Sequence, residues 1–322
     1  MLSLTCKPLR ARPQLWLAAL LLSASATCQA QSITEFDIPT PNSQPFSIVT
    51  GPDGALWFTE WMGNQIGRVT TSGSFTEYPL PNLDSSPIWI KVGPDGALWF
   101  TEMDGNRIGR ITLEGVITEY PLSVPDSEPW NIGVGTNNTL WFTQKGSNQL
   151  GAITTAGVIT EYNAPFSPWD LVLGNDGKIW LSGRRSDQVA TLTTSGQLIN
   201  TFRVPTPNSG PDVIIQGPNR PIWFTEQFGD KLAKISETGK ITEYQVPTPA
   251  SQPGGIAVGP DGNIWFVEHI GNNVGRSTTN GTITEFPVPT PGSYPDVIEQ
   301  GPDGAMWFTE HDTNKIGRIT VN

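Results

Sequence analysis

The chain has 322 residues with 30 acidic and 19 basic side chains, and its net charge of −11 makes it strongly acidic. Such a surface is repelled by nucleic-acid phosphates and by anionic lipid, so we expect neither as a partner. After residue 30 the sequence has no cysteine and no apolar run long enough to span a bilayer, which excludes a disulfide scaffold and a membrane-spanning helix.

The first 30 residues have the three parts of a secretory signal peptide. The positive start comes from Lys7, Arg10 and Arg12. A short apolar run at 15–22 follows, and small residues then lead to Cys28-Gln29-Ala30, which has the form of a cleavage site. We therefore expect residues 1–30 to be a signal peptide and residues 31–322 to be exported, to the periplasm or out of the cell.

The rest of the chain repeats at about 42 residues, and one tryptophan marks each of seven units. The tryptophans are Trp57, Trp99, Trp141, Trp180, Trp223, Trp265 and Trp307. Most units contain the Pro, Asp and Gly of a tight turn, as at 51–54, between runs rich in β-branched and aromatic residues. Four short strands per unit of this length are typical of a β-propeller blade.

The two ends of the chain predict how the ring closes. The last unit stops without its fourth strand, while Ile-Thr-Glu-Phe at 33–36 matches that strand in other units, such as Ile-Thr-Glu-Tyr at 117–120. An N-terminal strand that completes the last blade removes two exposed sheet edges. The predicted fold is all-β, a seven-bladed propeller of four-stranded blades over 31–322. Such a closed ring needs no second copy, so we expect a monomer.

Residues that recur in most units are expected to have structural roles. We expect the tryptophans to fill space between blades. We expect the repeated arginine and glutamate, Arg68 and Glu77 in the first unit, to pair across strands. The glycines of Gly-Asn-x-Ile-Gly, such as Gly63 and Gly67, are expected to serve turns. Function should therefore lie where one unit departs from the others.

Two variable positions in every unit are predicted to face the same mouth of the channel. One follows the proline that opens each innermost strand, and the other lies four residues after the repeated tryptophan. There, units 2 to 4 contribute Trp89, Trp130, Trp169, Lys145, Arg184 and, next to it, Arg185. Units 5 to 7 contribute Asp212, Asp296, His269 and His311, with Glu268 and Glu310 beside the histidines. An aromatic wall facing a polar rim is typical of a small-molecule pocket.

The chain has two histidines, His269 and His311, which occupy the same position in adjacent units. Histidine can act as general acid, general base or metal ligand near neutral pH. The alternative is that both are exposed loop residues, and that Asp212 and Asp296 serve only turns. Arg184 lies in the least regular unit, which indicates either an anion site or sequence drift.

The repeated unit resembles that of the streptogramin B lyase (virginiamycin B lyase) family. The resemblance rests on Gly-Pro-Asp-Gly-Ala-Leu-Trp-Phe-Thr-Glu at 93–102, on the Gly-Asn-x-Ile-Gly-Arg-Ile-Thr and Ile-Thr-Glu-Tyr-Pro that follow, and on linkers such as Pro-Thr-Pro-x-Ser-x-Pro at 205–211. It covers nearly all of residues 33–322. It implies a seven-bladed propeller that opens a cyclic depsipeptide lactone by Mg²⁺-assisted elimination, in which a base removes a proton next to the ester carbonyl.

This chain departs from the family at the residues to which that activity is assigned. The family's histidines follow the opening proline of the last two units, where this chain has Gly254 and Asp296. Tyr294 matches a family glutamate, and a second family glutamate falls near His311. An aspartate can replace a histidine as a base or a hard-cation ligand. The candidate catalytic residues are Asp296, His311, His269 and Glu310, and the candidate ligand-binding residues are Trp89, Trp130, Trp169, Asp212, Tyr294 and Arg184.

Two functions remain open from the sequence. The first is a lyase of the carbon–oxygen elimination type that acts on a lactone or ester, with Mg²⁺ implied by the resemblance and its ligands unassigned. The second is a non-catalytic propeller that binds a small molecule, a glycan, a peptide or a protein.

Overall fold

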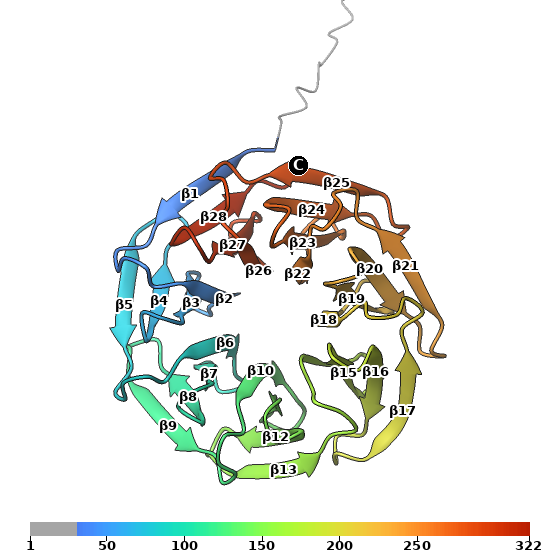
Figure 1. The fold of residues 1–322 in the computed structure, drawn as a ribbon. Helices are drawn as coiled ribbons and strands as arrows, with labels where there is room; N and C mark the ends of the chain where they lie inside the picture. Colours follow the sequence, from blue (N-terminus) through green and yellow to red (C-terminus); the bar gives the residue numbers. More distant parts are fainter. Residues whose placement is uncertain (1–30) are drawn as a thin grey trace, which may run out of the picture. The chain divides into compact units, whose positions relative to one another are not determined.

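The computed structural model describes residues 31–322, so the expected signal peptide at 1–30 lies outside the described residues. Residues 31–322 form a ring of seven four-stranded antiparallel sheets around a central channel (Figure 1). This described part contains strands and turns and no helix. The predicted all-β, seven-bladed propeller is therefore confirmed.

Within blades 1 to 6 the strands follow chain order from the channel outward, and in blade 7 the N-terminal strand is the outermost (Figure 1). Blades 1 to 3 contain β2 (Pro45–Thr50), β3 (Leu56–Glu60), β4 (Gln65–Val69) and β5 (Phe75–Pro79); β6 (Pro87–Val92), β7 (Leu98–Glu102), β8 (Arg107–Ile111) and β9 (Ile117–Pro121); and β10 (Pro129–Val134), β11 (Thr139–Gln144), β12 (Gln149–Thr154) and β13 (Ile159–Asn163). Blades 4 and 5 contain β14 (Leu171–Leu173), β15 (Ile179–Gly183), β16 (Gln188–Leu192) and β17 (Leu198–Arg203); and β18 (Pro211–Gln216), β19 (Ile222–Glu226), β20 (Lys231–Ile235) and β21 (Ile241–Gln245). Blades 6 and 7 contain β22 (Pro253–Val258), β23 (Ile264–Glu268), β24 (Asn273–Ser277) and β25 (Ile283–Pro287); and β26 (Pro295–Gln300), β27 (Met306–Glu310), β28 (Lys315–Ile319) and β1 (Ile33–Asp37).

The N-terminal strand β1 closes the ring as predicted. It pairs antiparallel with β28, with Ile33 opposite Ile319. Phe36 of β1 stacks on Trp307 of the same blade, with 5.4 Å between ring centroids. The equivalent rings Tyr78 and Trp57 of blade 1 stack at 5.5 Å. The seventh blade is thus packed like a blade made from continuous chain, and β28 is paired on both sides.

The repeated tryptophans lie between blades, as expected. Trp57 is fully buried in a cluster that includes Leu98 and Phe100 of the next blade. Its indole Nε1 donates to Asp53 Oδ1 at 3.1 Å, and Arg68 Nε donates to Asp53 Oδ2 at 2.7 Å. Arg68 lies opposite Trp57 in the strand register, and Asp53 in the turn accepts a hydrogen bond from each of these two repeated side chains.

Glu77 and Gly67 have roles that differ from the predicted ones. Glu77 binds the linker that enters its blade, accepting bonds from Thr40 N and Thr40 Oγ1 at 3.0 Å each. Gly67 lies inside β4, where a Cβ would come 2.1 Å from the Phe58 ring, so close packing requires it and the turn prediction is wrong. The positive φ of this turn, 53°, belongs to Asn64.

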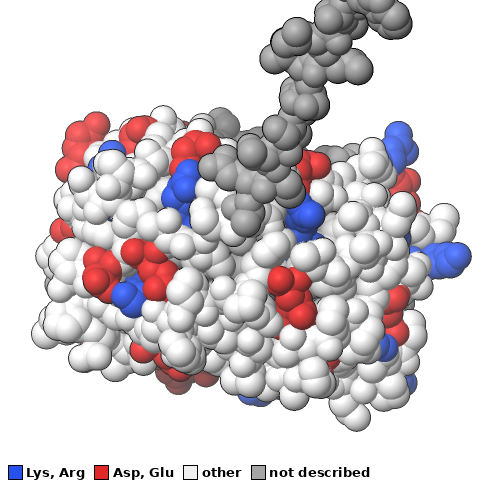
Figure 2. Space-filling view, turned by 90° about the horizontal axis from the view of Figure 1, so that it is seen from above, with Lys and Arg blue, Asp and Glu red and all other residues white. Residues whose placement is uncertain are grey.

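The outer wall of the ring carries mixed charges. In the view of Figure 2, acidic side chains form several separate groups with basic ones between them. No continuous basic surface is visible among the described residues on this face. Within residues 31–322 there is also no helix of the length and apolarity needed to cross a membrane.

Candidate functional site

The residues after the opening proline of most blades lie in a β-bulge at the channel mouth. In blade 7 the register shifts between Pro295 and Ile298, which leaves Asp296 and Val297 in the bulge. The same shift follows the opening proline of blades 1, 2, 3, 5 and 6. A bulge turns side chains out of the regular alternation of a strand. This local irregularity brings Asp296 and its counterparts to the channel.

The threonine of Trp-Phe-Thr-Glu stabilises this bulge. The backbone N–H of Val297 donates to Thr309 Oγ1 at 3.1 Å, and that hydroxyl donates to the carbonyl of Phe46 in the next blade at 2.7 Å. The same pair of bonds recurs at Thr59. The hydroxyl therefore satisfies a backbone group that the bulge removes from the sheet, and it links two blades beside the mouth.

A cavity of about 260 Å³ lies where the bulges meet. Nine of the predicted site residues line it: Trp89, Trp130, Trp169, Arg184, Asp212, His269, Tyr294, Asp296 and His311. The rings of Trp130 and Trp169 lie 4.7 Å apart on the aromatic side. The two variable positions of the blades thus meet at one mouth, while the chemical roles of the residues stay predictions.

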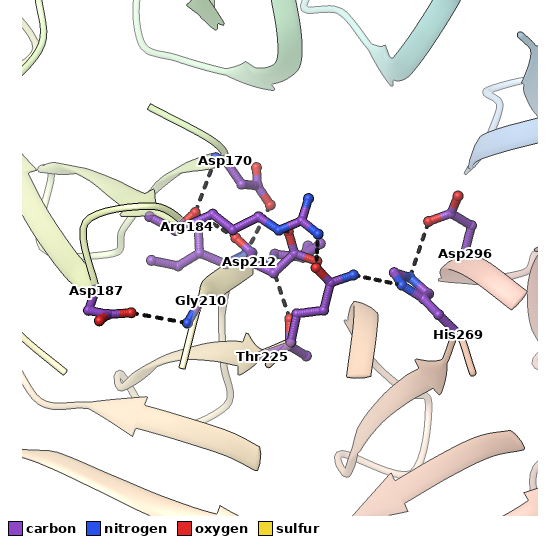
Figure 3. Close-up of polar contacts among 12 residues, drawn as sticks. Asp170, Arg184, Asp187, Gly210, Asp212, Thr225, His269 and Asp296 are labelled. Atoms are coloured by element: carbon purple, nitrogen blue, oxygen red, sulfur yellow. Dashed lines mark hydrogen bonds and ion pairs between the residues drawn. The ribbon is translucent and has the colours of Figure 1, made fainter. Parts of the chain in front are cut away.

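Asp296 lies between the two histidines on the polar side of the cavity. Its Oδ1 is 3.2 Å from His269 Nε2, and its Oδ2 is 3.7 Å from His311 Nδ1 (Figure 3 shows the first contact). The residue exposures of His269 and Asp296 are 6% and 7%, and the His311 side chain is 11% exposed. The alternative of exposed loop histidines is therefore wrong. The turn alternative for Asp296 is wrong as well, because the residue lies within β26.

A hydrogen-bonded chain reaches His269 from Arg184 (Figure 3). Arg184 donates to Gln227 Oε1, and Gln227 Nε2 lies 2.9 Å from His269 Nδ1. A guanidinium can only donate, so it fixes the amide oxygen toward Arg184 and the amide NH₂ toward the imidazole. His269 Nδ1 must then accept, which places the ring proton on Nε2, facing Asp296. Burial lowers the pKa of His269, but the contact with Asp296 and the charges of Asp296 and Asp212 raise it by more.

His311 lies in a more apolar setting than His269. Its ring centroid is 5.7 Å from that of Trp61, 6.0 Å from that of Tyr294 and 6.3 Å from that of Phe46. Tyr294 also stacks on His269, with 4.7 Å between centroids. Aromatic rings therefore hold both imidazoles in place while Asp296 contacts each of them.

Arg184 and Asp212 connect the polar and aromatic sides of the cavity. The Arg184 guanidinium lies over the Trp169 ring at 4.4 Å, and its Nε is 3.9 Å from Asp212 Oδ1. Burial raises the pKa of Asp212, against the opposing charges of Arg184 and His269. Asp212 lies in β18, so the turn alternative is wrong for this residue too.

Glu310 and Glu268 do not lie beside the histidines, which corrects the sequence prediction. Successive side chains of a strand point to opposite faces. Glu310 is fully buried and accepts a bond from Thr313 Oγ1 at 3.2 Å. Glu268 is likewise buried and binds Asn273 Nδ2 at 3.0 Å. Neither glutamate lines the cavity.

Several lining residues were not among the candidate site residues, although most of them stand at the two variable positions. They are Phe46, Trp61, Val213, Gln227, Gly255, Val297 and Asp312. Gln227 is the most informative, because it occupies the same position after its tryptophan as the two histidines do. This shared position indicates that Gln227 faces the mouth, but a side-chain amide has no acid–base chemistry that would mark it as a functional residue. Asp170, which follows Trp169, is fully buried below the mouth and bonds to Leu171 N at 2.6 Å and Ile214 N at 2.9 Å.

The virginiamycin B lyase family model matches residues 14–167 and 163–322 of this chain. The chain belongs to this family. A solved streptogramin B lyase structure is 35% identical, with a TM-score of 0.86 over 91% of this chain and 98% of that one. A catalytically inactive variant of the virginiamycin B lyase from Staphylococcus aureus, solved with quinupristin, has the same identity and TM-score and is covered completely.

Other comparisons are shorter or more distant. A virginiamycin B lyase of Bacillus licheniformis is 46% identical over 41 residues, which is 13% of this chain and 14% of that protein. The hydrazine synthase of Kuenenia stuttgartiensis is similar with a TM-score of 0.74 at 15% identity, over 88% of this chain and 97% of that one. This last likeness concerns the fold alone.

His269 occupies the space that a side chain at position 254 would take. A Cβ on Gly254 would lie 1.8 Å from His269 Nε2. The resemblance to the family implies a histidine after the opening proline of this blade, where this chain has Gly254. Here an imidazole reaches the same part of the mouth from the loop after β23. Glycine at 254 is what leaves room for it.

The mouth does not fit a magnesium ion. Mg²⁺ takes octahedral oxygen ligands, and within residues 31–322 no group of three or more His, Cys, Asp or Glu side chains forms a metal site. Both oxygens of Asp296 face imidazole nitrogens, and the guanidinium of Arg184 lies beside Asp212. A positive side chain there opposes binding of a second cation, so we derive no step through a metal.

Proposed function

We propose that this protein binds a small molecule at the channel mouth and opens an ester or lactone in it by elimination. The observation that carries the proposal is Asp296 between two shielded histidines in a cavity with an aromatic wall. Membership of the virginiamycin B lyase family supports the reaction class. The chain would then be a carbon–oxygen lyase.

In the proposed reaction His311 is the base and Asp296 positions it. His311 Nδ1 faces Asp296. Its Nε2, which lies 4.0 Å from Oδ1 of the exposed Asp312, would take a proton from the carbon next to a carbonyl. The electron pair of that C–H bond forms a C=C bond, and the C–O bond at the adjacent carbon breaks with release of the ester carboxylate. His269 faces the other oxygen of Asp296 with its proton on Nε2, so the carboxylate is held between the two imidazoles.

The test is incubation with a cyclic depsipeptide lactone followed by chromatography and mass spectrometry. Elimination opens the ring without a change in mass but alters the retention time, whereas hydrolysis adds one water. We expect the first result with native protein, no reaction with a double variant Asp296→Ala and His311→Ala, and native turnover with Arg220→Gln on an exposed loop. Full turnover by the double variant would overturn the proposal. Turnover that disappears with EDTA would assign the reaction to a metal instead.

The second candidate function is binding without catalysis. It is supported by the three tryptophans on one side of the cavity and by the different residues at the family's histidine positions, Gly254 and Asp296. Quenching of tryptophan fluorescence by an aromatic ligand that remains chemically unchanged would favour it. For either function we propose an exported monomer, because the first 30 residues have the pattern of a signal peptide and the ring is closed.

A further inference from the structure

A second, basic notch adjoins the cavity at the mouth. It has a volume of about 250 Å³ and is lined by Glu128, Lys145, Gly146, Ser167, Trp169, Arg184 and Arg185. It shares Trp169 and Arg184 with the mouth cavity, so the two spaces meet at the aromatic wall. Three cationic side chains thus gather beside this wall in a chain whose net charge is −11.

The two inner cations of the notch are held in place by aromatic rings. Lys145 Nζ lies 3.8 Å from the Trp130 ring centroid and 5.2 Å from that of Trp169. The Arg184 guanidinium lies 4.4 Å from the Trp169 centroid and 5.0 Å from that of Phe228. The side chains of Lys145 and Arg184 are only 17% and 23% exposed. Stacking on rings fixes a cation at little further entropic cost, which is what a binding site requires.

The protein neutralises this positive charge only in part. The carboxylate nearest Lys145 is Glu128, at 3.7 Å, and its side chain is 51% exposed. Arg184 Nε is buried without a hydrogen bond, with Asp212 Oδ1 3.9 Å away. Burial lowers the pKa of Lys145, and the charges of Arg185 and Arg184 add to this against the opposing effect of Glu128. A bound anion would therefore offset the repulsion among these three positive side chains, one of which has a buried N–H without a hydrogen bond.

We propose that this notch is a subsite for an oxyanion carried by the ligand, next to an aromatic or apolar part that packs on Trp130 and Trp169. The inference rests on the proposed small-molecule site and predicts that, among its ligands, those with a carboxylate, sulfate or phosphate group bind most tightly. Lys145 and Arg185 supply charge at the entrance, and Arg184, stacked on Trp169, adds a third positive charge beside the aromatic wall.

Direct binding of matched probes tests the subsite. The probes are 3-phenylpropanoate, its neutral amide, phenyl sulfate and phenyl phosphate, titrated into the protein with tryptophan fluorescence as the readout. We expect the native protein to bind the carboxylate about tenfold more tightly than the amide, since hydrogen bonds to a charged group contribute about 1.5–3 kcal/mol. The sulfate and phosphate show which oxyanion fits best. No preference for any anion over the amide would overturn the subsite.

Three variants and a control sharpen this test. Lys145→Met and Arg185→Gln are expected to reduce the preference for the carboxylate to about threefold or less. Glu128→Gln removes the competing carboxylate, so it should strengthen carboxylate binding about threefold and leave amide binding unchanged. Arg220→Gln, at a residue whose side chain is 80% exposed on another loop, should behave as native protein. A full preference in Lys145→Met, or no gain in Glu128→Gln, would contradict the proposal.

The lactone assay separates this inference from the proposed function. Neither Lys145 nor Arg185 is placed in the acid–base machinery, so both variants should open a neutral cyclic depsipeptide at the native rate. Native turnover without any anion preference removes the subsite alone. Anion preference without turnover removes the elimination activity and leaves the subsite standing.

Discussion

Two neighbouring positions in each blade differ in how often the same residue type recurs among the seven blades. Three residues after the repeated tryptophan, five of the seven blades have glutamate, and each is fully buried: Glu60, Glu102, Glu226, Glu268 and Glu310. One residue later no residue type occurs more than twice, and the series is Trp61, Met103, Lys145, Arg184, Gln227, His269 and His311. The first position faces the inside of its own blade, and at the second position every residue except Met103 lines the mouth cavity or the notch beside it.

The difference shows how a ring of repeats acquires a single site. Inside each blade the buried carboxylate meets nearly the same surroundings, such as Gln65 beside Glu60 and Asn273 beside Glu268, so one residue type serves in most blades. At the mouth the blades share one cavity, and a repeated side chain would place like groups against one another. Because the residue at this position differs between blades, the aromatic Trp61 lies in blade 1 and the cationic Lys145 and Arg184 lie in blades 3 and 4. The two histidines lie in blades 6 and 7.

The strongest test of this comparison uses two adjacent residues. His311→Ala removes the proposed base and should lower the rate of lactone opening at least about 100-fold, the usual contribution of general base catalysis. Glu310→Gln, one residue away on the other face, should keep the native rate. Initial rates with the same lactone, with near-ultraviolet circular dichroism to verify the fold, measure both. Equal losses in the two variants would mean that the two positions are not functionally distinct.

A second test concerns the packing inside the blades. Gly67→Ala places a methyl group 2.1 Å from the Phe58 ring, so we expect the free energy of unfolding to fall by about 2–3 kcal/mol. Gly54→Ala is the matched control, because nothing lies within 4 Å of its Cβ and only its φ of +73° opposes the change. That control should cost about 1 kcal/mol. Denaturant unfolding measures both, and equal losses would contradict the packing role of Gly67.

The buried glutamates predict how stability depends on pH. Burial raises the pKa of Glu60 and Glu102 to about 7, and that of Glu226, Glu268 and Glu310 to about 8. The folded chain therefore keeps these protons to higher pH than the unfolded chain, where glutamate titrates near 4.5. Their contribution to stability is fully present below about pH 4.5 and is lost as the pH rises toward 8.

Glu310→Gln isolates one of these groups. In the native protein burial raises the pKa of Glu310, and the charge of Glu35 raises it further. Hydrogen bonds from Thr313 and Ser293 and the charge of Lys315 lower it. The neutral amide cannot ionise, so the variant should be about 1 kcal/mol more stable than native protein at pH 8.5 and about equal at pH 5. Urea unfolding at the two pH values measures this. A variant that is less stable at pH 8.5 would show that the carboxylate is needed in its charged form.

The sequence predicted the fold because the evidence for it is local and repeated. The spacing of the tryptophans and the match of 33–36 to the outer strands determine the number of blades and the closure. The prediction that two variable positions share one mouth also follows from the repeat, since equivalent residues of a ring occupy equivalent places. No three-dimensional knowledge is needed for either step.

The predictions that were wrong depend on contacts between segments distant in sequence or on a change of one residue in register. The sequence placed Glu310 beside His311, but the alternation of the strand sends the two side chains to opposite faces. Gly67 serves the ring of Phe58, a residue on another strand. Gln227 carries no reactive group, and its importance comes only from its neighbours Arg184 and His269.

The smallest expected effect tests the contacts of Gln227 with Arg184 and His269 directly. Gln227→Glu replaces the amide that faces His269 Nδ1 at 2.9 Å with a carboxylate, which accepts hydrogen bonds instead of donating them. The imidazolium of His269 then has an acceptor at each ring nitrogen, so we expect the pKa of His269 to rise further. Proton NMR titration of the imidazole measures this in a His311→Ala background, which leaves His269 as the chain's only histidine. An unchanged titration would mean that Arg184 does not orient the amide, and the assignment of the ring proton to Nε2 would fall with it.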